Sequence, residues 1–69
     1  NDWKNAQSFF EKSLRIVPTD INTLILLGDV FLAQGHARKA EEKYHIALNL
    51  NKDSGLAKII KSKIKNISK

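Results

Sequence analysis

Apolar residues recur at helical spacing from the start of the chain. Steps of three and four residues, which place side chains on one face of an α-helix, separate Trp3, Ala6, Phe10, Leu14 and Val17. Pro18 ends this pattern because it has no backbone N–H to donate. The pattern predicts a first helix over residues 2–17.

The next segment, residues 21–34, is apolar on nearly every side. Thr19 and Asp20 offer side-chain oxygens that can cap its start, and Gly35 can take the left-handed conformation that ends a helix. A helix this apolar must lie between other helices. With the following segment it is expected to form the centre of the core, through Leu27, Phe31, Tyr44 and Leu48.

Two further helices are predicted, over residues 37–50 and 55–68. Between them the turn sequence "NKDSG" provides Asp53 or Ser54 as the cap of the last helix. No segment has the alternating pattern of a β-strand. The fold class predicted from the sequence is therefore all-α, with four helices in antiparallel succession.

The chain also repeats itself. A shift of 34 residues sets Ala6 on Ala40, Phe10 on Tyr44 and Leu14 on Leu48, so that small residues match small ones and aromatic residues match aromatic ones. A fixed period of this length is typical of helical repeat arrays. Gly28 and Ala40 are small where two helix backbones are expected to approach closely.

The period and the residues at fixed places resemble the tetratricopeptide repeat (TPR) family. Those residues are Leu27, Gly28, Phe31, Gly35, Ala40, Tyr44, Ala47 and Leu48 in one unit, and Trp3, Ala6, Phe10, Leu14 and Pro18 in the unit before. Departures from the family pattern occur at Ser13, Leu24, Ala37 and Lys52. The resemblance implies antiparallel hairpins of a TPR-type α-solenoid: residues 1–20 as the second helix of a partial repeat, 21–54 as a complete repeat, and 55–69 as a basic C-terminal capping helix.

The same resemblance implies a protein–protein interaction module, because the first helices of that family line a groove that takes peptides or helices. The matching positions in this chain are Asn22, Ile25, Asp29, Leu32 and Ala33. Asp29 would repel an acidic C-terminal peptide, so the expected ligand is an apolar or basic segment. The competing interpretation of Asp29 is an ordinary solvated residue.

Charge suggests an alternative function. The net charge is +5, and the excess comes from the last sixteen residues, where Lys58, Lys61, Lys65 and Lys69 share one side of the predicted helix. Such a row of lysines could bind an anionic partner, including nucleic acid. Sequence-specific recognition of nucleic acid is not expected, since the row has no arginine and no aromatic residue. Solvation of a capping helix is the simpler interpretation of the row.

The first helix predicts self-association. By the resemblance it would pack against a first helix of its own unit, which residues 1–20 do not include. The apolar edge left open would consist of Trp3, Ala6, Phe9, Phe10 and Ser13. Exposed apolar patches mark association sites, and the simplest arrangement is a two-fold homodimer.

Catalysis is not expected. The chain has no Cys and only two His, His36 and His45, which fall on opposite helix faces, so neither a thiol enzyme nor a metal site is predicted. No phosphate-binding loop or nucleophile motif is present, and no cofactor is expected. The most apolar run is far shorter than a membrane span, and the first residues do not form a signal peptide. These features favour a cytoplasmic protein.

Overall fold

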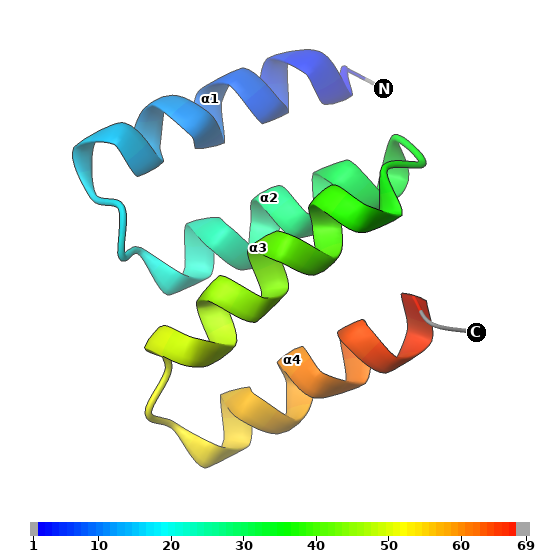
Figure 1. The fold of residues 1–69 in the computed structure, drawn as a ribbon. Coiled ribbons are helices and arrows are strands. Elements are labelled where there is room, and N and C mark those ends of the chain that lie inside the picture. The colour runs from blue at the N-terminus through cyan, green and yellow to red at the C-terminus, as the bar shows by residue number, and fades with distance from the viewer. Residues whose placement is uncertain (1, 68–69) are drawn as a thin grey trace.

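Residues 2–67 are described by a computed structural model, and all regular secondary structure in this range is helical. The helices are α1 (Trp3–Ile16), α2 (Ile21–Ala33), α3 (Ala37–Leu50) and α4 (Ser54–Ile67). Successive helices run in opposite directions (Figure 1). The predicted all-α class and the order of four helices are confirmed. The bounds agree with the prediction to within one residue, except that the predicted end at residue 68 lies outside the described residues.

Aspartates begin three of the helices. The backbone N–H groups of Asn5, Thr23 and Leu56 donate to the carboxylates of Asp2, Asp20 and Asp53 at 3.2, 3.4 and 2.9 Å. Each bond satisfies one of the N–H groups that a helix start leaves without an intrahelical partner. Of the alternatives that the sequence left open, the structure uses Asp20 rather than Thr19 and Asp53 rather than Ser54.

The turn between α2 and α3 depends on Gly35. Its φ of +84° is in the left-handed region, where glycine has no Cβ to clash. The N–H of Gly35 donates to the carbonyl of Leu32 at 3.0 Å, and the N–H of His36 donates to the carbonyl of Phe31 at 2.8 Å. These two bonds form the Schellman arrangement that closes a helix. They turn the chain directly into α3.

The core is centred on α2 and α3. Its buried residues are Leu24, Ile25, Leu27, Phe31, Ala40, Tyr44, Ala47 and Ile60. Leu27, Phe31 and Tyr44 are buried as predicted, whereas Leu48 is half-buried at the margin. Seven residues of α2 are buried, in agreement with the expectation that this helix lies between others.

The helices form a flat molecule of 30 × 30 × 16 Å. α2 packs against α1 and α3, and α4 packs against α3 (Figure 1). α1 has no fully buried residue and attaches to the core through half-buried Phe10 and Leu14. Within residues 2–67, no helix combines the length and the hydrophobicity needed to cross a membrane.

Gly28 lies under the ring of Tyr44. A Cβ atom built on Gly28 would be 2.5 Å from Cε1 and 2.8 Å from Cδ1 of that ring. The sequence predicted a small residue here because two backbones approach. The structure shows that the space beside Gly28 is occupied by the aromatic ring of Tyr44 from the neighbouring helix.

Candidate functional site

A polar cluster joins three helices at the side chain of Asp29. Its Oδ1 atom accepts a hydrogen bond from the Tyr44 hydroxyl at 2.5 Å and another from Nζ of Lys63 at 3.0 Å. Nζ of Lys63 also lies 5.9 Å from the centroid of the Tyr44 ring. One carboxylate oxygen on α2 therefore holds side chains from α3 and α4.

Asp29 and Lys63 are 34 residues apart, which is the period of the sequence repeat. They occupy equivalent positions on α2 and α4 and carry opposite charges. Lys63 was not among the predicted site residues, and its contact is the carboxylate of Asp29. Both side chains are partly exposed, and pairs of this kind contribute about 1 kcal/mol or less. The pair joins α4 to α2, two helices that are not consecutive in the chain.

The hydroxyl of Tyr44 is held in its neutral form. Burial, the hydrogen bond to Asp29 and the negative charge of Asp29 all raise the pKa of Tyr44 well above its ordinary value of 10.0. The unfolded chain loses this proton near pH 10, while the folded chain keeps it to higher pH. The corresponding stability is complete below about pH 10 and is lost as the pH rises beyond it.

We therefore expect an alkaline loss of stability that depends on Tyr44. The free energy of unfolding should fall above about pH 10 more steeply in the wild type than in Tyr44→Phe, because the variant has no phenol to ionise. Urea titrations of both proteins between neutral and alkaline pH measure the difference. Tyr44 is the only tyrosine, so phenolate absorbance follows the same ionisation directly. Parallel pH curves for the two proteins would contradict this account.

Four of the five residues expected to line a groove are accessible to some degree. Asn22, Leu32 and Ala33 are exposed and Asp29 is half-buried. Ile25 differs, because only 9% of it is exposed and it belongs to the core. The lining therefore excludes Ile25, which packs inward.

Leu26 belongs to this surface and was not among the predicted residues. It is 46% exposed, and helical spacing places it on one line with Asn22, Asp29 and Ala33. The family resemblance assigned Ile25 rather than Leu26 to the groove, and the structure shows the opposite exposure of these two neighbours. The feature of the sequence that could have located this surface is the pair of opposite charges, Asp29 and Lys63, one period apart.

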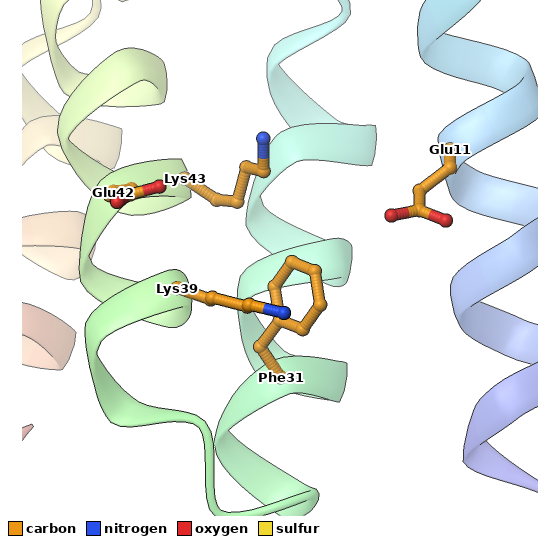
Figure 2. A pocket seen from close by; sticks show the side chains of 5 residues that line it. All are labelled: Glu11, Phe31, Lys39, Glu42 and Lys43. Atoms are coloured by element: carbon orange, nitrogen blue, oxygen red, sulfur yellow. The ribbon is translucent and has the colours of Figure 1, made fainter.

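A separate hollow lies between α1 and α3. Its volume is about 220 Å³, and it is lined by Glu11, Phe31, Lys39, Glu42 and Lys43. Figure 2 shows Lys39 reaching the Phe31 ring, with Glu11 on the opposite side; the ammonium is 5.7 Å from the ring centroid. Two lysines and two glutamates balance in charge. This hollow thus selects no particular ligand charge.

The predicted self-association edge is partly open. Phe9 is the most exposed aromatic residue, at 66%, and Trp3 is exposed as well. Ala6 and Ser13 are half-buried, and the Ser13 hydroxyl donates to the carbonyl of Phe9 at 3.0 Å. Phe10 was expected to be part of the open patch, but its side chain packs against the core. The neighbouring Phe9 points outward instead.

The lysines of α4 are accessible. Lys58, Lys61 and Lys65 are all exposed, as the helical spacing predicted. Lys69, the fourth member of the predicted row, lies outside the described residues. Ile59, between the first two, is also exposed.

The described residues 2–67 contain no group of three or more His, Asp or Glu side chains arranged to hold a metal ion. The accessible candidate regions are three surfaces: the side of α2 that carries Asp29, the open side of α1 and the lysines of α4. No protein-family profile, curated protein sequence or solved structure matches this chain.

Proposed function

We propose that this chain is a protein-interaction module made of TPR-type helical hairpins, and that it binds a peptide or helix on the surface formed by α2 and α4. The 34-residue period and the antiparallel order of the helices support this proposal. The binding surface contains Asn22, Leu26, Asp29, Leu32 and Ala33. Neither a cofactor nor a catalytic group is required for this function.

The bond between Asp29 and Lys63 is the observation that carries the proposal. In a solenoid, equivalent positions of successive first helices lie beside each other, because each unit is related to the next by the same small rotation. Two residues one period apart meet this condition at 3.0 Å. α2 and α4 also run in the same direction (Figure 1). We propose that the ligand lies along α2 on the side where Lys63 of α4 contacts Asp29.

The proposed ligand is apolar at the positions that contact α2. Leu26 and Leu32 offer exposed apolar area there, and burying such area favours association. From the sequence, an acidic ligand was not expected, because Asp29 would repel it. In the structure Lys63 compensates that charge, so hydrophobic contact rather than the sign of the ligand charge should dominate binding at this surface.

Peptide binding should depend on Leu32. A charged residue at this position would need to be desolvated by an apolar ligand, so Leu32→Glu should weaken binding of an amphipathic, apolar-faced synthetic peptide by about tenfold. The matched control is Ile46→Glu on α3, since these two apolar residues are 42% and 41% exposed. Nuclear magnetic resonance titration of the labelled chain measures both affinity and location.

The expected shifts fall on amides of α2 around Asn22, Leu26 and Ala33. Equal weakening by Leu32→Glu and Ile46→Glu would contradict the proposed surface. So would shifts confined to α1.

We also propose that the isolated chain forms a homodimer through the open side of α1. The exposure of Phe9 supports this, and so does the exposure of Trp3 on the same helix. Within the described residues no helix covers this side of α1 and α2. A second copy related by a two-fold axis would bury the apolar edge on both chains.

Phe9→Glu should shift the chain from dimer to monomer. In a two-fold dimer each protomer would bury its own Phe9, so the substitution removes two buried aromatic rings and introduces two charges. We therefore expect self-association to be at least about a hundredfold weaker. Ser8→Glu on the same helix is the control for the added charge. Sedimentation at tens of micromolar measures the change. Phe10→Glu is less suitable, because Phe10 packs against the core. A wild-type monomer under these conditions would contradict the dimer.

A further inference from the structure

The outer face of α4 has unusual charge. Lys58, Lys61 and Lys65 are exposed, and the helix sequence from Ser54 to Ile67 contains no Asp or Glu. Lys63 has a carboxylate partner in Asp29. Among residues 2–67 the other three lysines have no ion-pair partner. α4 therefore presents a row of uncompensated positive charges.

The same positions one period earlier are occupied by core residues. Leu24, Leu27 and Phe31 precede Lys58, Lys61 and Lys65 by 34 residues, and all three are buried. They share the core with residues from α3, namely Ala40, Tyr44 and Ala47. The packing of α2 against α3 is thus a template for a helix lying against α4.

The two sets of residues in this template have complementary spacing. Along α2 the steps are three and then four residues, and along α3 they are four and then three. Reversed steps match because the two helices are antiparallel (Figure 1). A helix placed in the same way on α4 would face its lysines with residues at positions i, i+4 and i+7.

We propose that the outer face of α4 docks an acidic helix of a partner protein, with carboxylates at i, i+4 and i+7 that meet Lys65, Lys61 and Lys58. This surface is distinct from the proposed peptide surface, because Lys63, which contacts Asp29 there, is on the opposite side of α4 by helical spacing. Each carboxylate pairs with a lysine that has no acidic neighbour on its own helix.

A helix fits this face better than nucleic acid does. The three lysines span seven residues, or about 10 Å of helix, which equals the span of i to i+7 on a facing helix. α4 has no arginine to read base edges and no aromatic residue on which bases could stack.

The test uses a synthetic helical peptide as the probe. It carries Glu at i, i+4 and i+7, and a second peptide of identical composition places the three Glu on different sides of the helix. We expect the first peptide to bind the chain about tenfold more tightly than the second at near-physiological salt. Equal affinities would overturn the proposal, because spacing would then have no role.

Matched variants separate the local row from the net charge. The variant Lys58→Gln, Lys61→Gln, Lys65→Gln should lose about tenfold in affinity for the first peptide, whereas the control Lys4→Gln, Lys12→Gln, Lys52→Gln changes the net charge equally and should lose far less. All six lysines are exposed, so both variants should fold, which circular dichroism verifies. Equal losses would overturn the proposal.

A duplex DNA oligonucleotide provides the competing outcome. If DNA binds more tightly than the peptide and loses affinity in the α4 triple variant, the row is a polyanion site and the acidic-helix proposal is wrong.

Discussion

Replacing Gly28 by leucine is expected to cost about 3 kcal/mol of the free energy of unfolding, because the new side chain has no space. Even a Cβ atom would lie 2.5 Å from the ring of Tyr44. That ring is fully buried, and its hydroxyl is held by Asp29. Neither a rotation of Tyr44 nor a shift of α3 can relieve the clash without breaking other contacts.

This loss would be a large part of the total stability, which for a chain of this length is about 3 to 10 kcal/mol. Urea denaturation followed by circular dichroism measures it. The control is Gly55→Leu in the first turn of α4, where a Cβ atom would meet only Asp53 at an ordinary 3.5 Å. Similar stabilities for Gly28→Leu and the wild type would show that α2 and α3 do not pack as described.

The cause can be tested by removing the ring. In Tyr44→Leu the aromatic carbons above Gly28 are absent, so a Gly28→Ala substitution should cost less in that background than in the wild type. Residues in direct contact show such coupling, whereas distant ones add independently. If the free-energy costs of the two substitutions were additive, the ring of Tyr44 would not be what prevents a side chain at position 28.

Leu27→Ala is expected to cost about 2 to 5 kcal/mol, because it leaves a cavity in the centre of the core. Only 1% of Leu27 is exposed, whereas the adjacent Leu26 is 46% exposed. Leu26→Ala is therefore the matched control: the same atoms are removed from the same helix one position away. We expect it to cost less than about 1 kcal/mol, since surface substitutions have small effects.

The comparison of these two variants also tests the orientation of α2. Thermal or urea unfolding of both proteins gives the difference directly. If the two costs were equal, or if Leu26→Ala cost more, α2 would be rotated relative to the described arrangement. In that case the surface assigned to Asn22, Leu26 and Asp29 would be part of the core.

Several features of the interaction surfaces could be predicted from the sequence, and others could not. The exposure of Lys58, Lys61 and Lys65 followed from helical spacing, because three lysines on one face cannot all be buried. The contact between Lys63 and Asp29 was not predicted. It depends on the distance between two helices that are not consecutive in the chain, and local pattern contains no information on that distance.

The sequence by itself determined the helices and where they begin and end. Periodic apolar residues, the capping carboxylates of Asp20 and Asp53, Pro18 and Gly35 act within a few residues of the chain. Their effects on hydrogen bonding and backbone conformation are therefore local. For this reason the predicted bounds agree with the structure to within one residue wherever it describes the chain.

The tertiary structure decided which of several similar residues face inward. Phe9 and Phe10 are neighbours of the same type, yet only Phe10 packs on the core; Leu26 and Ile60 are equivalent in the repeat, yet only Ile60 is buried. Burial depends on which other helices lie beside a residue, and α4 has α3 beside it while the outer side of α1 and α2 has no cover among residues 2–67. Equivalent segments of a repeated sequence therefore form similar helices, but the tertiary structure places different neighbours beside them.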